Sequence, residues 1–149
     1  MIPIKYLCFD IGGVANVRLP DYIILSSAQK YWRRKFSKED FNKIVHPANE
    51  DRDFWKEFQN GQINAETYIN AAFKVGKLTA ATDSKIFFRS LLEAWCGTPY
   101  YPLLGLVEIL KKNGYYTSVL SNNNEIMYNT PSAEIKNRVH LSLSSHLIG

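Results

Sequence analysis

The sequence has little cysteine, which excludes several classes of fold and site. Only two cysteines occur among its 149 residues, Cys8 and Cys96, and they lie far apart. Two distant cysteines do not make a disulfide framework, and neither has the spacing of a zinc ligand pair. We interpret both as buried free thiols, because cysteine in an apolar segment is usually buried, and we therefore expect a reducing, cytoplasmic location.

Long hydrophobic runs and strong charge are also missing. No apolar stretch is long enough to cross a bilayer. Residues 1–5 have no basic region followed by a long apolar run, so we expect no signal peptide and no membrane partner. The formal net charge is only +4, and residues 33–35 form the one tight basic cluster. Such an isolated cluster is typical of the solvent-exposed end of a helix, so nucleic-acid binding is only the weakest alternative.

Aromatic residues, in contrast, are plentiful. They make up 13% of the chain, and apolar residues make up 46%, which is enough for a sizeable hydrophobic core. A chain of this length forms one domain, or one core with a small insertion.

The most informative segment is a short apolar run that ends in an acid. Residues 4–9 are apolar or aromatic except for Lys5, which predicts a buried strand, and Asp10 follows directly. In open parallel α/β sheets, ligands bind at the carboxyl ends of the strands. The paired glycines after Asp10 allow a ligand to approach the main chain closely. The alternative is an aspartate that only bonds the N–H groups of a turn.

The segment from Asp10 to Val14 reads D-x-G-G-V and resembles motif I of the haloacid dehalogenase-like (HAD) hydrolases. The resemblance implies an α/β fold with a HAD-type, Rossmann-like parallel sheet. It also implies that Asp10 is the nucleophile that attacks phosphorus, and that Mg²⁺ is held by the Asp10 carboxylate and the Gly12 carbonyl. Gly12 stands where most phosphatases of the family have an acid that protonates the leaving group.

Residues 20–96 predict several short helices with aromatic inner faces and no strand between them. Ser37 has the features of a helix cap, and the stretch from Phe54 to Glu66 resembles one that is common in helical cap domains of the HAD family. We therefore expect an α/β core made of residues 1–19 and 97–149, with residues 20–96 inserted as a helical cap. The expected helices cover residues 22–35, 38–46, 50–58, 63–75 and 82–95, and we interpret their aromatic residues as packing, not as a cofactor site.

The second half returns to an α/β pattern. A helix that starts near Pro102 ends at Gly114, and residues 115–120 predict a strand. Ser121 and Asn122 follow it, in a resemblance to motif II of the HAD family. The resemblance implies that the Ser121 hydroxyl and the backbone N–H of Asn122 hold phosphoryl oxygens. The alternative is an asparagine-rich turn. Residues 139–143 predict a third strand, with His140 partly exposed in it.

Motifs III and IV of the family, a lysine and further acids, are absent from the chain. Magnesium would then have only one carboxylate, one carbonyl and water, too few anionic ligands for tight binding. We expect a HAD-like phosphatase or hydrolase of a small phosphorylated molecule with little or no turnover.

The expected sheet leaves the edge of strand 4–9 unpaired. We therefore expect a homodimer through this strand, or a truncated product. The alternative function is a non-catalytic binding or regulatory fragment that pairs through the same edge.

Overall fold

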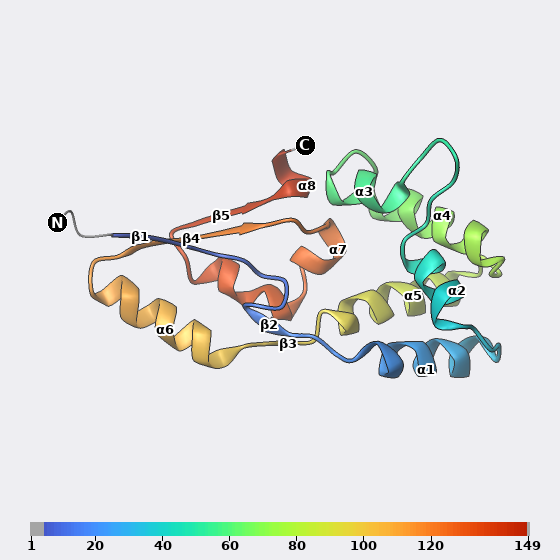
Figure 1. Cartoon of the computed structure of the whole chain (residues 1–149), viewed down its shortest axis with the longest axis horizontal. Coiled ribbons are helices and arrows are strands. Elements are labelled where there is room, and N and C mark those ends of the chain that lie inside the picture. The colour runs from blue at the N-terminus through green and yellow to red at the C-terminus, as the bar shows by residue number, and fades with distance from the viewer. Residues whose placement is uncertain (1–4, 149) are drawn as a thin grey trace.

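The computed structural model describes residues 5–148, and Figure 1 shows two parts side by side. One part is a three-stranded parallel sheet in the order β1-β4-β5. Its strands are β1 (Tyr6–Phe9), β4 (Tyr116–Ser121) and β5 (Leu141–Ser144). The α/β fold with a Rossmann-like parallel sheet is therefore confirmed.

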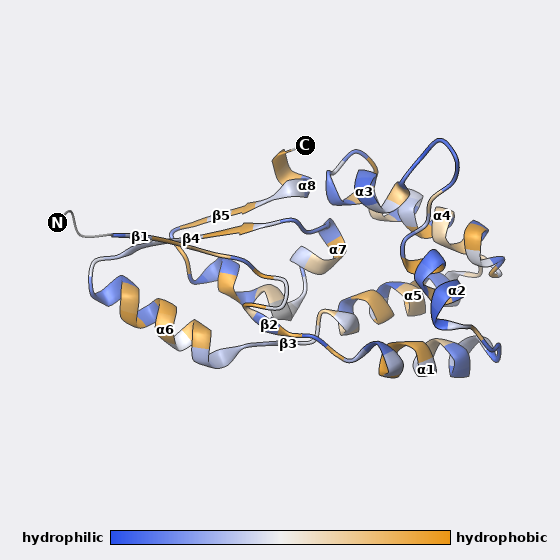
Figure 2. Ribbon diagram, viewed as in Figure 1, coloured by the Kyte–Doolittle hydropathy of each residue, from blue (hydrophilic) through white to orange (hydrophobic). Residues whose placement is uncertain are grey.

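Helices cover one face of this sheet. These are α6 (Tyr101–Lys112) and the 3₁₀ helix η1 (Pro131–Asn137). Figure 2 shows hydrophobic residues along β4, β5 and α6. The buried residues of this small core include Val107 from α6, Val119 from β4 and Ile135 from η1. They hold the carboxyl ends of β1 and β4 in a fixed relation, which positions the site described below.

The other face of the sheet is open, and this corrects the prediction that residues 4–9 form a buried strand. Tyr6 is 52% exposed and Cys8 is also exposed, so the prediction of two buried thiols holds only for Cys96. The reason is that α6 and η1 lie on one face only, so apolar side chains on the other face stay in contact with solvent, even on the central strand β4. β1 is also an edge strand, with β4 as its only neighbour among the described residues. Ile4 lies outside the described residues. Four further apolar side chains on β4 and β5 remain 37–55% exposed: Tyr116, Leu120, Leu141 and Leu143.

The second part is a helical unit of α1 (Asp21–Trp32), α2 (Lys38–Val45), α3 (Phe54–Gln59), α4 (Ala65–Gly76) and α5 (Thr82–Trp95). Its core is aromatic, as predicted, and includes Phe58, Tyr68 and Phe88. The Ser37 side chain accepts the N–H of Asp40, which confirms Ser37 as the cap of α2.

Two predicted helices in this unit have different bounds in the structure. The helix expected over residues 50–58 begins only at Phe54, because the Asp53 side chain caps it by accepting the N–H of Lys56. The helix expected over residues 22–35 begins at Asp21, with Pro20 at the N-cap position, and ends at Trp32.

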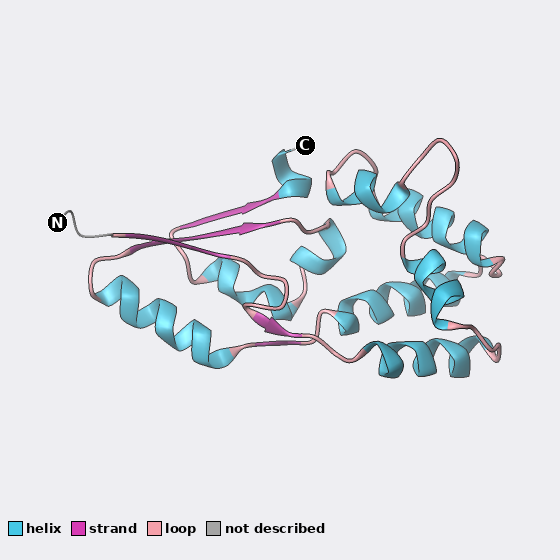
Figure 3. Cartoon of the chain, in the orientation of Figure 1, coloured by secondary structure: helices cyan, strands magenta, loops and turns pink. Residues whose placement is uncertain are grey.

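Two short strands connect the parts, where the sequence had predicted loops. β2 (Asn16–Val17) pairs antiparallel with β3 (Thr98–Pro99), and Figure 3 shows this pair between the sheet and the helical unit. Gly97 has φ +73°, and a Cβ at this position would lie 1.8 Å from the Val17 carbonyl oxygen. The two crossing segments can therefore run side by side only with glycine here.

The chain after β4 contains two short helices, α7 (Glu125–Tyr128) and α8 (Ser145–Ile148). The third predicted strand is confirmed but starts at Leu141, so His140 lies just before it instead of within it. His140 is exposed, and its Nδ1 accepts the backbone N–H of Thr117 at 3.1 Å. Within residues 5–148, no helix combines the length and hydropathy that a bilayer crossing needs.

Candidate active site

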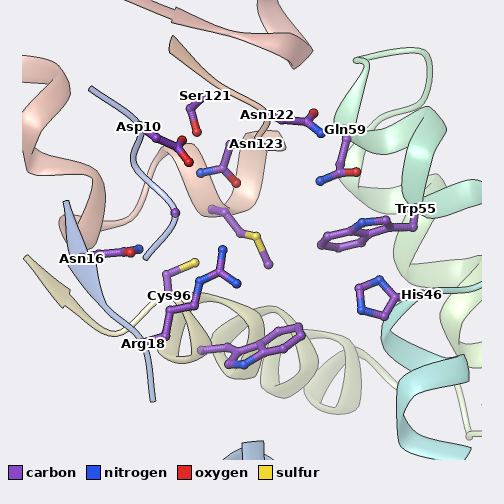
Figure 4. Close-up of a pocket in the computed structure, with 13 residues that line it drawn as sticks. Asp10, Asn16, Arg18, His46, Trp55, Gln59, Cys96, Ser121, Asn122 and Asn123 are labelled. Carbon is purple, nitrogen blue, oxygen red and sulfur yellow. The ribbon is translucent and has the colours of Figure 1, made fainter. Parts of the chain in front are cut away.

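A cleft of about 370 Å³ opens between the sheet and the helical unit. Figure 4 shows its lining, which comes from both parts of the molecule. The lining residues from the sheet side are Asp10, Gly12, Asn16, Arg18, Ser121, Asn122, Asn123 and Met127, and those from the helical side are His46, Trp55, Gln59, Trp95 and Cys96.

The candidate residues from the two sequence motifs meet in this cleft. Phe9 of β1 is in register with Val119 of β4, so the carboxyl ends of the two strands lie at the same level. Asp10 follows β1 directly and Ser121 ends β4, and both line the cleft. Figure 4 shows the oxygens of both side chains at the same end of it. The topology thus brings together two residues that are far apart in the sequence.

Hydrogen bonding leaves both side chains available to a ligand. Oδ1 of Asp10 accepts the backbone N–H of Ile11 at 2.7 Å. Within the described part of the chain, Oδ2 of Asp10 and the hydroxyl of Ser121 have no hydrogen-bond partner. Ser121 is 4% exposed, so protein surrounds its hydroxyl on most sides. A carboxylate oxygen and a preorganised hydroxyl donor face the same space.

The turn after Asp10 is held by its own backbone. Gly13 has φ +74°, and its N–H donates to Oδ1 of Asn16 at 2.8 Å. The N–H of Ala15 donates to the carbonyl of Ile11 at 3.0 Å. This tight turn carries the chain from β1 into β2, and it needs glycine at position 13 because the left-handed region is unfavourable for other residues.

The three asparagines after Ser121 have different roles. Asn122 is exposed and lines the cleft. The carbonyl of Asn123 accepts the hydroxyl of Ser144 at 3.1 Å, which ties this loop to β5. Asn124 is 1% exposed and caps α7 by accepting the N–H of Met127. The asparagine-rich turn is therefore real at Asn124, while Asn122 remains a candidate for ligand binding.

Sequence reasoning missed Arg18. This residue follows β2, and Figure 4 shows its guanidinium in the cleft. A Cβ at Gly12 would lie 2.8 Å from Nη2 of Arg18, so the guanidinium lies directly beside the glycine turn. The available signal was a single arginine eight residues after Asp10, but nothing in its spacing showed which way it would point.

Sequence reasoning also assigned the aromatic residues of the helices to packing alone. The packing role is confirmed for Trp55 and Trp95, which pack against the helical core, but both also line the cleft, as does His46. The ring centroids of His46 and Trp55 are 4.6 Å apart, and those of His46 and Trp95 are 6.2 Å apart. Burial against these neighbours lowers the pKa of His46 below its usual value, an effect that the nearby Asp53 carboxylate opposes. A neutral imidazole and two indoles therefore form the helical wall of the cleft.

The donor set for a metal ion at this site is small. Within residues 5–148, no three His, Cys, Asp or Glu side chains are grouped as they would be to hold a metal. Of the residues that the structure describes, Asp10 is the only one that brings a carboxylate to the cleft, and the Gly12 carbonyl would be the second donor. Mg²⁺ in proteins is often held by one or two carboxylates together with substrate phosphate and water. These residues fit a weakly held Mg²⁺ and do not fit a tight site.

No protein-family model matches this sequence, and no curated protein matches it. The fold, however, is similar to that of solved structures of the HAD family enzyme BT-2542 from Bacteroides thetaiotaomicron. The wild-type enzyme in complex with magnesium and inorganic phosphate aligns with a TM-score of 0.67 and 18% identity, over 98% of this chain and 71% of the enzyme.

Two further structures of that enzyme align in the same way. An aspartate-to-alanine mutant, also in complex with magnesium and inorganic phosphate, has a TM-score of 0.72 and 15% identity over 98% of this chain and 71% of that chain. The magnesium complex has a TM-score of 0.67 and 18% identity over 97% and 69%. These likenesses confirm that the chain has a HAD-like fold.

Proposed function

We propose that this chain, with its HAD-like fold, is a HAD-like hydrolase that binds the phosphoryl group of a small molecule. One observation carries the proposal: the carboxylate of Asp10 and the hydroxyl of Ser121 line the same end of one cleft, from adjacent parallel strands. The magnesium and phosphate complexes of BT-2542 support a phosphoryl ligand for a protein of this fold.

In the proposed reaction, the free carboxylate oxygen of Asp10 attacks phosphorus, and the bond between phosphorus and the leaving oxygen breaks. The Ser121 hydroxyl and the backbone N–H of Asn122 donate to phosphoryl oxygens and stabilise their developing charge. The leaving oxygen takes a proton from water, because Gly12 offers no acid. Water then hydrolyses the aspartyl phosphate, which releases phosphate and restores the carboxylate of Asp10.

We further propose that Asp10 and the carbonyl of Gly12 hold Mg²⁺, which would offset charge between the carboxylate and the phosphoryl group. Among residues 5–148, no second carboxylate lines the cleft to complete the site. We therefore expect weak magnesium binding and little or no turnover.

The domain division proposed from the sequence fits this chemistry. Residues 1–19 and 97–149 would form the core that carries the reacting groups. Residues 20–96 would form the cap, whose rings close the other side of the cleft. We also propose a cytoplasmic location, since Cys8 and Cys96 are both free thiols.

The proposal is tested with beryllofluoride, which mimics an aspartyl phosphate, in the presence of magnesium. We expect fluorine NMR to detect an adduct with the wild-type chain and none with Asp10→Asn. Asp83→Asn, which removes an exposed carboxylate from the first turn of α5, is the matched control and should form the adduct. Equal adducts in all three proteins would contradict the role of Asp10. Rapid Asp10-dependent turnover of an aryl phosphate would instead overturn the expected lack of activity.

A second candidate function rests on the edge of β1. This strand has β4 as its only partner among residues 5–148, and Tyr6 and Cys8 are exposed. We propose that strand 4–9 pairs with a second copy of the chain, which would hydrogen-bond the free edge. Sedimentation velocity over a wide concentration range tests this pairing. A monomer at every concentration would argue against it and against a fragment that acts by edge pairing.

A further inference from the structure

Among residues 5–148, Arg18, Arg33 and Arg34 are the arginines without an ion pair to a carboxylate, and of these three only Arg18 lines the cleft. Three arginines of the described chain are paired with carboxylates: Arg52 with Glu57, Arg89 with Glu93, and Arg138 with Glu134 and Glu108. Arg18 has no such pair and no hydrogen bond among residues 5–148, and it is the only cation that lines the cleft. An unpaired guanidinium in a cleft is ready to bind an anion.

The guanidinium of Arg18 lies beside the glycine turn that follows Asp10. Its Nη2 is beside Gly12, two residues from Asp10. A phosphoryl dianion placed against Asp10 and Ser121 would meet the negative charge of the carboxylate. A guanidinium beside the same turn offsets this repulsion and can donate two parallel hydrogen bonds to phosphoryl oxygens.

The opposite wall has a different chemistry. His46, Trp55 and Trp95 line the cleft, and neither tryptophan is fully buried. Figure 4 shows the rings of His46 and Trp55 on this side of the cleft. No indole N–H of the two tryptophans is bonded to another described residue. Flat apolar surfaces favour a flat apolar ligand, because aromatic rings gain both area burial and ring–ring attraction. A flexible polyol would gain neither.

We propose that Arg18 is the cation that binds the phosphoryl group, and that the wall of His46, Trp55 and Trp95 selects phosphate esters of planar, aromatic alcohols. The inference rests on the proposed function, because it assumes a phosphoryl group between Asp10 and Ser121. It adds a residue that the sequence motifs do not contain and a class of substrate. It also gives Gly12 a steric role, since any side chain there would displace the guanidinium of Arg18.

The test is equilibrium binding, so that it does not depend on turnover. Phenyl phosphate, glycerol phosphate and inorganic phosphate are titrated in the presence of magnesium, and the amide NMR signals of Gly12 and Ser121 are followed. We expect phenyl phosphate to bind more tightly than glycerol phosphate. Loss of a charge-assisted contact weakens binding by about tenfold to a hundredfold. Arg18→Gln should therefore weaken the binding of all three ligands by this factor. Arg18→Lys should recover part of the affinity, because lysine keeps the positive charge but cannot donate two parallel hydrogen bonds as a guanidinium does.

Two controls separate charge and shape. Arg33→Gln makes the same charge change at an exposed site on α1's C-cap and should leave all three affinities unchanged. Trp55→Leu should weaken the binding of phenyl phosphate alone, and Trp55→Phe should bind phenyl phosphate as tightly as the wild-type chain does. Thermal melts of each variant establish that it is folded.

The outcomes distinguish the two proposals. If inorganic phosphate shifts the signals of Gly12 and Ser121 equally in the wild-type chain and in Arg18→Gln, the role of Arg18 is wrong and the proposed function stands. If phenyl and glycerol phosphate bind equally well, or if Trp55→Leu changes neither, the aromatic substrate class is wrong. If no phosphate compound perturbs these signals, the proposed function itself fails, and this inference fails with it.

Discussion

The hydroxyl of Ser145 donates a hydrogen bond of 2.6 Å to the carbonyl oxygen of Gln59. This bond joins α8, which follows β5, to the end of α3 in the helical unit. The two backbones also lie close together beside this bond, since a Cβ added at Gly61 would lie 2.4 Å from the carbonyl oxygen of His146. The two parts of the molecule therefore meet backbone to backbone on the side where Gln59 lines the cleft.

Gly61→Ala should separate α8 from the helical unit. The backbone at this position has φ +71°, and the added methyl group would overlap the carbonyl of His146. Strain of this kind costs about 1–3 kcal/mol, and displacement of α8 adds to it. We expect a lower midpoint in urea and faster hydrogen exchange in α3 and α8, measured by mass spectrometry.

Gly114→Ala is the matched control for this prediction. Gly114 has φ +80°, but a Cβ there would meet no atom within 4 Å. The control therefore carries the backbone strain without the collision, and it should leave exchange in α3 and α8 unchanged. If both variants lose the same stability and show the same exchange pattern, the close contact with α8 contributes nothing.

Tyr68 gives the helical unit a dependence on alkaline pH. This side chain is 0% exposed, and its hydroxyl donates to the carbonyl of Val45 at 2.7 Å. Burial raises the pKa of Tyr68 far above its ordinary value of 10.0. The folded state thus keeps a proton that the unfolded chain releases above pH 10, so the free energy of unfolding falls as pH rises, by up to about 1.4 kcal/mol per pH unit.

Tyr68→Phe should remove this dependence, and urea unfolding between pH 9 and pH 12 measures it. The variant loses about 1 kcal/mol at neutral pH, because the carbonyl of Val45 loses its partner. Above pH 10, its stability should fall less steeply than that of the wild-type chain. Tyr22→Phe is the control, since Tyr22 is 71% exposed. Parallel pH profiles for Tyr68→Phe and the wild-type chain would disprove the prediction.

Local signals in the sequence predicted the helical unit well. Ser37 caps a helix whose first turn follows it directly in the chain, and α5 occupies the predicted residues because its apolar face repeats at helical spacing. Asp10 and Ser121 were also predictable, because both lie at the carboxyl ends of strands, and parallel strands end at one edge of a sheet. These features depend on neighbours within one element or on a general rule of topology.

The features that were not predicted depend on contacts between distant segments. The exposure of Cys8 follows from the uncovered face of the sheet, which the apolar residues of β1 do not reveal. The pairing of β2 with β3 joins segments about 80 residues apart, and only this pairing directs Arg18 into the cleft. Trp55 and Trp95 have the same helical spacing as residues that only pack. The sequence therefore could not show that they also line the cleft.

The titration of His46 reports on the wall of the cleft. Burial lowers its pKa from the usual 6.5, so the folded state resists protonation there. The stability that this group contributes is present above pH 6.5 and is lost as the pH falls below that value, because the unfolded chain then binds the proton more readily. Trp55→Leu should admit water to the imidazole and move its titration midpoint upward. Proton NMR of the imidazole in the wild-type chain and in the variant measures this change.

The two thiols should differ strongly in reactivity. Cys8 is exposed on β1, whereas Cys96 is 6% exposed at the end of α5, so a thiol reagent should modify Cys8 rapidly and Cys96 only when the chain unfolds. Ellman's reagent measures both rates, and Cys8→Ser should remove the fast phase alone.

If β1 pairs with a second copy, the rate at Cys8 should also fall as protein concentration rises, because pairing restricts access to the edge. A rate at Cys8 that is independent of concentration would support a free edge, and a slow rate at every concentration would contradict the exposed position of β1.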